Sequence, residues 1–297
     1  MSSRNNPISA VQKKRTASTT PKKRTVSSSR PSRAPKKAPV KQHYSMPGWL
    51  RNILAVAIVG CFSMVFYYFF IRPYAYRWKP CNGLKEYGVC IPSGYDIHGI
   101  DISHYQGKID WGRLLQNKQT ATPLHFIFMK ATEGGDHNDT TFQTNFANAR
   151  NHGFIRGAYH FYIPGTDALK QADFFIRTVK LDTGDLPPVL DVEVTGRKEK
   201  KELQQGIKRW LDRVESHYGV KPILYTSYKF KTRYLDDSIF NAYPYWIAHY
   251  YVDSVRYQGK WHFWQHTDVG SVPGIKEDVD LNVFNGSLEE LKKLTIK

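Results

Sequence analysis

The 297-residue sequence predicts an α/β fold in which a disordered basic tail and one transmembrane helix precede a closed, TIM-like barrel. Two observations predict this order. A long apolar stretch follows a tail rich in Lys, Arg, Ser, Thr and Pro, and β-like runs alternate with helix-like segments from His98 onward. A chain of this length can hold one large domain plus attached segments, and its 41% hydrophobic content suits a packed core.

Residues 1–48 carry most of the excess positive charge. They contain twelve Lys and Arg and no acid, and the first acid of the chain is Glu86. Because this segment has too few apolar side chains to offset the entropy of ordering, we expect a disordered tail. From Arg72 onward thirty basic residues face all twenty-six acids, a difference of only four. Such a balanced domain is a poor candidate for nucleic-acid binding, and the tail is expected mainly to set membrane topology. Binding of the tail to anionic lipid or nucleic acid is the alternative.

Residues 49–72 are expected to form a transmembrane helix. The nineteen residues Ile53–Ile71 contain no charge. They would span about 28 Å as a helix, close to a hydrocarbon core of roughly 30 Å. Interfacial aromatics flank the stretch at Trp49, Tyr74, Tyr76 and Trp78. A cleaved signal peptide is the alternative, but the run is long for one and no small-x-small site follows it. With the basic tail in the cytoplasm, the remaining chain would be periplasmic or extracellular.

Residues 73–96 form a juxtamembrane segment in which we expect a disulfide between Cys81 and Cys90. Eight residues separate the two cysteines, and oxidation is permitted outside the cytoplasm. Two free thiols are the alternative. Cys61 lies inside the apolar stretch and is expected to fill space there. No Cys/His spacing resembles a zinc site, so we expect neither metal nor cofactor.

Residues 97–290 are expected to form the barrel. Strands are predicted at His98–Ser103, Leu124–Thr132, Arg156–Tyr162, Pro188–Val194, Pro222–Thr226, Tyr245–Ala248, Trp261–Gln265 and Val279–Phe284. Helices are predicted at Trp111–Gln116 after a capping Asp110, near Thr141–His152 and Asp167–Val179, and at Lys200–Tyr218 before Gly219. Repeated β-α units predict a parallel sheet, and eight strands in about 200 residues favour a closed barrel over an open doubly wound sheet. The last three strands lack full helices, and no Gly-x-Gly-x-x-Gly indicates a dinucleotide site.

Acidic residues recur where barrel strands would end. Asp101 lies near the end of the first strand, Asp191 and Glu193 lie in the fourth, and Asp280 lies in the eighth. Because side chains of a strand alternate between faces, Asp191 and Glu193 share one face, opposite that of Leu190, Val192 and Val194. Desolvation of two neighbouring carboxylates raises the pKa of at least one, as a general acid near neutral pH requires. An isolated Asp-x-Glu is equally typical of caps and metal ligands.

Seven motifs in a fixed order make the chain from His98 to about Phe284 resemble glycoside hydrolase family 25, the lysozymes. They occupy residues 99–107 with 109–111, 128–134, 157–162, 190–193, 244–250, 264–265 and 279–282. The resemblance implies a (β/α)5(β)3 barrel. It also implies cleavage of the β-1,4 bond between N-acetylmuramic acid and N-acetylglucosamine in peptidoglycan, a hydrolase activity that serves cell-wall catabolism.

The resemblance implies a role for each of the four acids. Glu193 would be the general acid that protonates the leaving oxygen, and Asp191 would orient or stabilise the sugar's 2-acetamido group. Asp101 and Asp280 would support them. The pair on one strand is similar to that of substrate-assisted glycosidases, so a retaining route is favoured over direct attack by water.

Further candidates for substrate contact lie in or near the same motifs: Tyr159, Tyr225, Trp246, Tyr250, Gln265 and Glu133. The rings could stack on sugars or pack inside the barrel. Gln265 could bind an acetamido group or be a buried, satisfied amide, and Glu133 could bind substrate or cap a loop. His160 is expected to be structural.

Two other functions remain open. The first is a non-catalytic peptidoglycan-binding module on the same fold. The second is a metal-dependent hydrolase in which the four acids are oxygen ligands. Peptidoglycan strands and the membrane are the expected partners, and no nucleic acid is expected; the sequence indicates no particular oligomeric state.

Overall fold

The computed structural model describes residues 45–72, 81 and 83–297. The predicted disordered tail up to residue 44 lies outside the described residues, as do the interfacial aromatics Tyr74, Tyr76 and Trp78.

The apolar stretch forms helix α1, Gly48–Phe66, which continues as one π-helical turn at Tyr67–Ile71. Within the described ranges it is the one helix that is long and apolar enough to cross a membrane. A helix suits that environment because it satisfies its own backbone hydrogen bonds. Its length and composition fit an anchor and a signal sequence equally well. Cys61 is exposed on its surface and unpaired.

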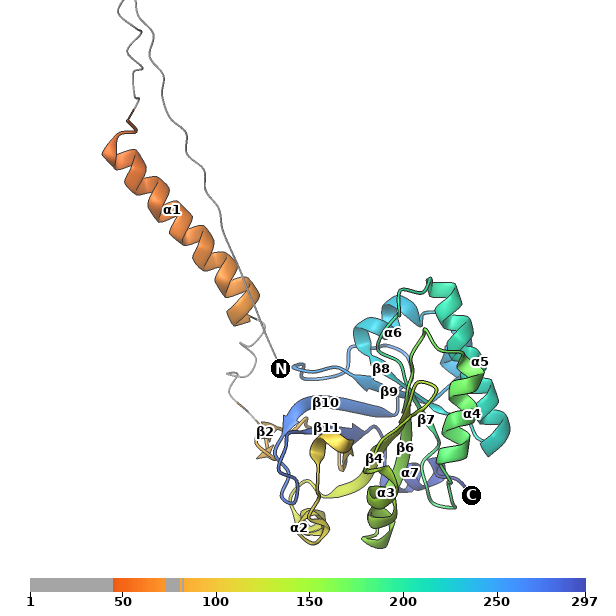
Figure 1. The fold of residues 1–297 in the computed structure, drawn as a ribbon. Coiled ribbons are helices and arrows are strands. Elements are labelled where there is room, and N and C mark those ends of the chain that lie inside the picture. Colours follow the sequence, from red (N-terminus) through yellow and green to blue (C-terminus); the bar gives the residue numbers. More distant parts are fainter. Residues whose placement is uncertain (1–44, 73–80, 82) are drawn as a thin grey trace, which may run out of the picture. The chain divides into compact units, whose positions relative to one another are not determined.

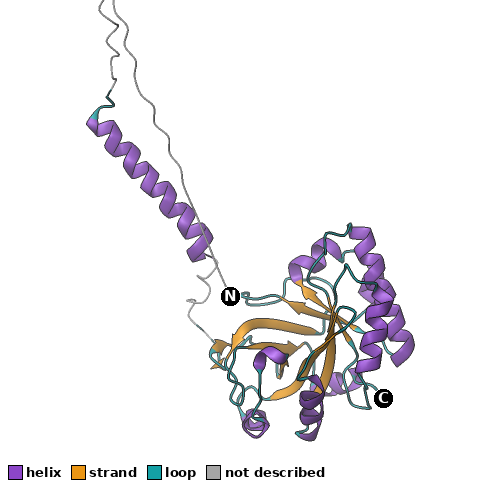
Figure 2. Cartoon of the chain, viewed as in Figure 1, coloured by secondary structure: helices purple, strands orange, loops and turns teal. Residues whose placement is uncertain are grey.

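Eight strands close into a barrel (Figures 1 and 2). Around the barrel they are β3 (Ile97–Ile102), β4 (Leu124–Glu133), β6 (Ile155–Phe161), β7 (Val189–Asp191), β8 (Ile223–Ser227), β9 (Tyr245–Ala248), β10 (Phe263–Gly270) and β11 (Val279–Phe284). Because β3 pairs with both β4 and β11, the sheet has no open edge there. The closed barrel is therefore confirmed, and the open doubly wound sheet is wrong. The short β5 (His137–Asn138) pairs with the end of β4 outside this ring.

A helix follows each of the first five strands. These helices are α2 (Trp111–Gln116), α3 (Phe142–Asn151), α4 (Ala168–Thr178), α5 (Lys200–Tyr218) and α6 (Tyr228–Tyr234). No helix separates β9, β10 and β11 along the chain, so the (β/α)5(β)3 arrangement is confirmed. Local signals set the ends: Asp110 accepts a hydrogen bond from the backbone N–H of Arg113 at 3.0 Å, and Gly219 ends α5 with a φ of 72°.

Strand direction differs from the expectation at one place. Six neighbouring pairs from β3 through β10 are parallel, as the β-α repeats predict. However, β11 runs antiparallel to both β10 and β3, because a short connection rather than a crossover helix joins β10 to it. The start of β11, rather than its end, consequently lies at the mouth formed by the ends of the parallel strands.

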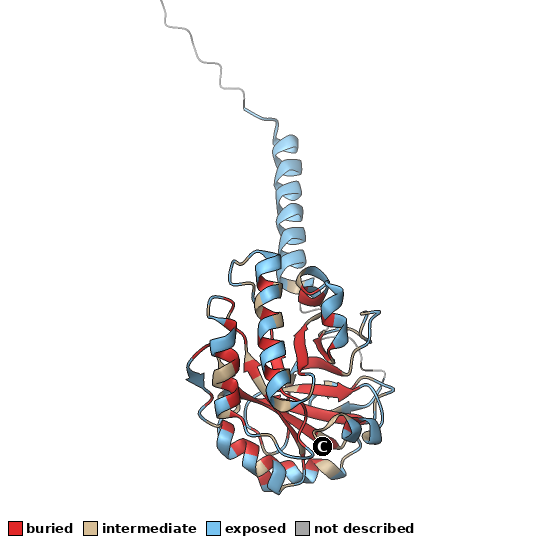
Figure 3. Cartoon of the chain, turned by 90° about the vertical axis from the view of Figure 1, so that its right-hand side faces the viewer, coloured by how far each residue is buried: buried red, intermediate tan, exposed pale blue. Residues whose placement is uncertain are grey.

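Apolar side chains form two layers separated by the sheet. On β4, Phe126 and Phe128 point into the barrel, whereas Ile127 and Met129 pack against the surrounding helices. Figure 3 shows buried strands enclosed by helices whose outer faces are exposed. A last helix, α7 (Leu288–Leu294), places Leu291 in the inner cluster. Helix α7 therefore packs on the end of the barrel.

A small hairpin precedes the barrel and packs on a part of it that has no helix. Strands β1 (Lys85–Glu86) and β2 (Val89–Cys90) are antiparallel, and a disulfide joins Cys81 to Cys90. Tyr87, at the turn, donates a hydrogen bond through its hydroxyl to the carbonyl of Thr122 at 3.0 Å, and its own carbonyl accepts one from the N–H of Ser271 at 2.8 Å. The hairpin is thus attached to the barrel on two sides.

Candidate active site

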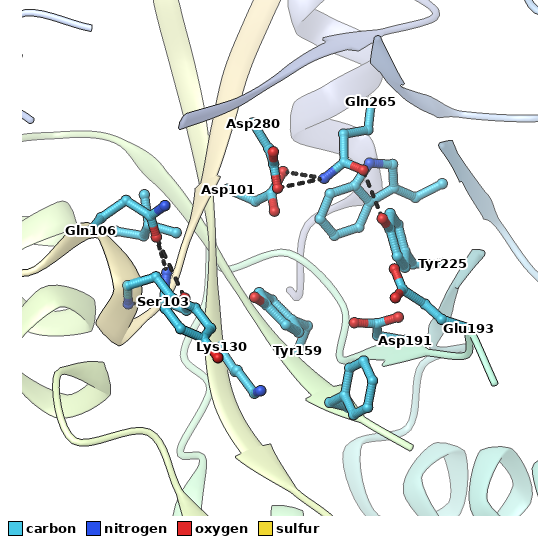
Figure 4. Close-up of a pocket in the computed structure, with 14 residues that line it drawn as sticks. Asp101, Ser103, Gln106, Lys130, Tyr159, Asp191, Glu193, Tyr225, Gln265 and Asp280 are labelled. Carbon is cyan, nitrogen blue, oxygen red and sulfur yellow. Dashed lines mark hydrogen bonds between the residues drawn. The ribbon is translucent and has the colours of Figure 1, made fainter. Parts of the chain in front are cut away.

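The mouth of the barrel holds a cavity of about 230 Å³ (Figure 4). All four predicted acids lie in it, together with most of the other predicted residues. Its lining is Asp101, Ile102, Ser103, Tyr105, Gln106, Lys130, Tyr159, Phe161, Asp191, Glu193, Tyr225, Trp246, Gln265 and Asp280. Two predicted contact residues, Glu133 and Tyr250, are not part of this lining.

Asp101 and Asp280 form a carboxyl pair on neighbouring strands. They are directly opposite each other in the β3–β11 register. Burial raises the pKa of Asp101 to about 6, and burial together with the charge of Asp101 raises the pKa of Asp280 to about 9. A hydrogen bond joins the two carboxyls. Near neutral pH the pair therefore holds one proton and one negative charge.

Amide groups hold this pair in place. The Gln265 amide donates to Asp101 at 2.8 Å and to Asp280 at 3.2 Å, and the Asn282 amide donates to the same oxygen of Asp101 at 2.7 Å. The Gln265 carbonyl oxygen accepts from the hydroxyls of Tyr225 at 2.6 Å and Tyr250 at 2.5 Å. Of the two roles considered for Gln265, the geometry corresponds to the buried, satisfied amide. Tyr250 supports it from outside the cavity.

Asp191 and Glu193 reach the cavity from one segment, although β7 is shorter than predicted. The strand ends at Asp191, yet the next residue stays extended because the N–H of Val192 donates to the carbonyl of Tyr225 at 3.0 Å. Alternation therefore continues for two residues, and both acids line the cavity. Leu190 and Val192 pack into the outer layer as expected. Val194 does not, because it is 43% exposed where the chain has left the barrel.

The two acids differ in their surroundings. Asp191 is buried, and no described residue donates a hydrogen bond to its Oδ1. Burial raises the pKa of Asp191 well above its usual range, and the charges of Glu193 and Asp101 raise it further. Glu193 is exposed at the rim, beside Tyr225 in Figure 4. Partial desolvation raises the pKa of Glu193, and the neighbouring Tyr225 hydroxyl and the charge of Lys130 oppose that shift.

An ion pair below Asp191 was not predicted. Lys130 and Glu133 are joined at 2.6 Å, and Lys130 is the basic residue of the lining. Residues three apart on a strand normally point to opposite faces, but the β4–β6 register shifts between Lys130 and Thr132. This bulge places both charged side chains on the inner side. The charge of Lys130 acts to lower the pKa of Asp191 and Glu193.

Aromatic residues form the floor and one rim. Trp246 is buried, stacks on Phe128 with ring centroids 4.4 Å apart, and donates through Nε1 to Asn282 at 2.8 Å. It is therefore a floor residue rather than an open stacking platform. Tyr105 is 73% exposed, and its ring lies 4.2 Å from that of His104. The motif Ser-His-Tyr-Gln contained this residue, but nothing in the sequence indicated that its ring projects into the mouth.

Two sets of contacts fix the turn that carries Tyr105. His104 contacts Asp139 through its backbone N–H at 2.8 Å and through Nδ1 at 2.9 Å, and the Asp139 side chain is fully buried. Ser103 and Gln106 form a reciprocal capping box around the same turn. The exposed ring is thus held by contacts below it.

His160 is structural, as expected. It is fully buried between Thr132, whose Oγ1 lies 2.7 Å from Nδ1, and Gln171, whose Oε1 lies 3.1 Å from Nε2. Burial lowers its pKa to about 4, which keeps it neutral.

The acid cluster contains amide donors where a metal site would need free ligand oxygens. One oxygen of Asp101 already accepts from both Gln265 and Asn282. Within residues 45–72, 81 and 83–297, no three or more His, Cys, Asp or Glu side chains are arranged to hold a metal ion.

Comparisons with known proteins agree with this geometry. The family model described as glycosyl hydrolases family 25 matches residues 100–275. The uncharacterized protein YegX of Escherichia coli is 43% identical over 224 residues, 75% of this chain and 80% of YegX. Lysozyme M1 of Streptomyces globisporus is 32% identical over 67% of this chain and 71% of its own length. The structure of a bacterial lysozyme from Streptomyces coelicolor matches with a TM-score of 0.63 and 32% identity, covering 68% of this chain and 98% of that one.

Proposed function

The chain belongs to glycosyl hydrolase family 25, and from this premise we propose that it is a peptidoglycan muramidase whose general acid is Glu193. It cleaves the β-1,4 bond between N-acetylmuramic acid and N-acetylglucosamine. One observation carries the proposal: Asp191, Glu193 and the Asp101–Asp280 pair converge in a single cavity at the barrel mouth. Relatives named as lysozymes support the substrate class.

Glu193 suits the role of general acid because it is accessible and holds its proton more tightly than an ordinary glutamic acid. Its place at the rim lets it reach a glycosidic oxygen, and its raised pKa keeps a protonated fraction at higher pH. It donates this proton to the leaving oxygen as the glycosidic bond breaks. As a carboxylate it then accepts a proton from the water that completes hydrolysis.

Asp191 suits the role of orienting the 2-acetamido group. Asp191 lines the cavity, and its Oδ1 accepts no hydrogen bond from the described residues, so the carboxyl has capacity to accept one from an acetamido N–H. Accepting that hydrogen bond turns the acetamido oxygen toward the anomeric carbon. This oxygen forms a bond to carbon as the leaving oxygen departs, and water later breaks that bond. The two inversions give net retention.

The Asp101–Asp280 pair supplies one delocalised negative charge at the floor. A developing positive charge on the sugar ring is stabilised by such a fixed charge in a site largely shielded from water. Gln265, itself held by Tyr225 and Tyr250, keeps the pair in position without a change of geometry during the reaction.

Muropeptide release from purified peptidoglycan, followed by mass spectrometry, tests this function. The full-length protein should release fragments with reducing N-acetylmuramic acid, and Glu193→Gln should bind the wall but release almost none. Equal release by both would contradict the role of Glu193. Wall binding without release by either protein would favour the non-catalytic binding module. NMR of the first anomer released decides between retention and inversion.

We also propose that residues 49–72 anchor the protein, with residues 1–48 in the cytoplasm and the 97–290 barrel in the periplasm or outside the cell. The apolar α1 and the uneven charge of its flanks support this topology. The disulfide in the 73–96 segment fits an oxidising compartment. Full-length protein should stay in membranes after alkaline extraction. An N-terminus found just after residue 72 would instead identify a cleaved signal sequence.

A further inference from the structure

A second hollow lies at the closed end of the barrel, away from the catalytic mouth. Its volume is about 430 Å³, and it shares no lining residue with the catalytic cavity. The register pair Phe263 and Phe284 marks this end, because Gln265 and Asp280 mark the other end of the same two strands. The hollow is formed by residues 259–262 before β10, by the end of β11 and by α7. We call it the closed-end groove. Helix α7 lies beyond the segment that matches the family model.

The groove has an aromatic side. Trp261 is half-buried, and its ring is packed against Tyr95, with ring centroids 6.0 Å apart. Tyr95 in turn contacts Trp264 of the barrel at 5.8 Å. The indole is therefore held from behind while part of it remains open to the groove. Such a ring can stack on the apolar face of a sugar.

The groove also has two exposed positive charges. Lys260 and Lys293 are both exposed, and neither forms an ion pair or hydrogen bond with another residue of 83–297. Lys292, on the same helix as Lys293, is by contrast paired and lies 3.4 Å from Glu289. The acid of the groove, Glu290, already accepts a hydrogen bond from the N–H of Ser287 at 2.7 Å as part of a capping box. The charge of Lys293 also helps to lower the pKa of Glu290, so a ligand would meet two exposed ammonium groups and one carboxylate that is already hydrogen-bonded.

We propose that the closed-end groove binds peptide-substituted glycan as a second, non-catalytic site. A sugar ring lies on Trp261, and carboxylates of the attached peptide pair with Lys260 and Lys293. Asn285, which also lines the groove, adds an amide for hydroxyl or acetamido groups. The basic N-terminal tail is excluded as an occupant by its like charge. This inference rests on the proposed function for its choice of polymer.

Two sites at opposite ends allow the enzyme to hold one part of the wall while it cuts another. Simultaneous binding raises the effective concentration of the second site, so the groove matters for the intact network and not for short fragments. This difference separates a binding site from a merely structural role.

Cosedimentation of the full-length chain, in detergent micelles, with isolated sacculi tests the groove. Glu193→Gln is the background, so that the wall is not cut. Lys260→Gln combined with Lys293→Gln, and separately Trp261→Ala, should each weaken binding about tenfold or more. Lys292→Gln, on the same helix but outside the groove, is the matched control and should bind normally. Unchanged binding by the double lysine variant would overturn the proposal.

Activity provides the second measurement, with Glu193 intact. The groove variants should cut short soluble glycans at the parent rate and cut sacculi more slowly. If the groove variants cut both substrates equally slowly, the proposal is overturned. It is also overturned if these variants lose binding to anionic phospholipid vesicles but still bind sacculi normally. Trp261→Phe should restore binding if ring stacking matters. If Trp261→Ala does not fold, sacculus binding by the double lysine variant alone tests the proposal. If the parent protein binds sacculi through the groove but cuts neither substrate, the proposed enzymatic function is wrong and the proposed groove is still supported.

Discussion

Asp101 and Asp280 lie directly opposite each other across β3 and β11, the antiparallel pair that completes the barrel. Two carboxyls that are joined by a hydrogen bond cannot both be ionised without strong repulsion, so they share a proton. Asp191 and Glu193 lie in the same cavity from the other wall, where β7 ends. The site thus contains two pairs of acids. Asp101 and Asp280, the floor pair, share one negative charge, and in the rim pair of Asp191 and Glu193 it is Glu193 that is accessible.

The rim pair leads to the first prediction. Glu193→Gln should lower kcat by about 10²- to 10⁴-fold, because the amide cannot donate a proton to the leaving oxygen as the acid does. Binding of the intact wall should change little. The exposed Glu199 gives a matched control, since Glu199→Gln removes a nearby charge without touching the cavity. Full activity of Glu193→Gln would require a different acid.

The acetamido route predicts a dependence on the substrate's own amide. A glycan in which the reacting sugar is de-N-acetylated should be cut at least about 100-fold more slowly by the wild-type protein, because no acetamido oxygen is available to attack. Asp191→Asn should slow cleavage of the acetylated substrate and should slow cleavage of the de-N-acetylated glycan little further. Equal rates on both substrates would support direct attack by water.

The floor pair predicts a stability change with pH. The pKa of Asp280 is about 9 in the folded state, above the usual value of 3.8. A raised folded-state pKa contributes stability below pH 4 that is lost as the pH rises toward 9. Asp280→Asn removes that loss, so the variant should gain stability over the wild type by at least about 1 kcal/mol at pH 8, roughly 2–4 °C in Tm. Thermal unfolding at pH 4 and pH 8 measures it. The exposed Asp253→Asn should show no such trend.

Lys130 predicts a shift of the acid limb of the pH–rate profile. Its charge lowers the pKa of Asp191 and Glu193, so Lys130→Met should raise both pKa values. If Asp191 must be ionised, the acid limb should move to higher pH by about one unit. Lys130→Arg keeps the positive charge and should leave the limb near its original position. A drop in rate with an unmoved limb would indicate a structural role alone.

Tyr105 predicts a change in substrate affinity without a change in stability. Because 73% of its surface is exposed, Tyr105→Ala should leave the melting temperature almost unchanged. Loss of a ring that stacks on the glycan should raise KM about fivefold, equivalent to ~1 kcal/mol, with kcat largely kept. Tyr105→Phe keeps the ring and should behave as the wild type. A normal KM for Tyr105→Ala would remove this residue from the binding surface.

Local patterns were enough to predict much of the fold. The bounds of α2, α5, β9 and β11 match the predictions because each depends on features within a few residues, such as the Asp110 cap, the terminal Gly219 and alternating apolar side chains. The same alternation placed Asp191 and Glu193 on one side of the chain. The motifs then indicated that these acids act with Asp101 and Asp280.

Sequence by itself therefore determined the eight barrel strands, the first four helices of the barrel, the closed barrel and the four acids that line its mouth, but not α6 or α7. Only the tertiary structure decided the direction of β11, which brings Asp280 to the mouth from the start of its strand rather than the end. It also decided the bulge that pairs Lys130 with Glu133, and the position of Tyr250 behind Gln265. These features depend on register and on contacts between residues far apart in the chain. Local propensity carries no information about such contacts, because they form only when the barrel closes.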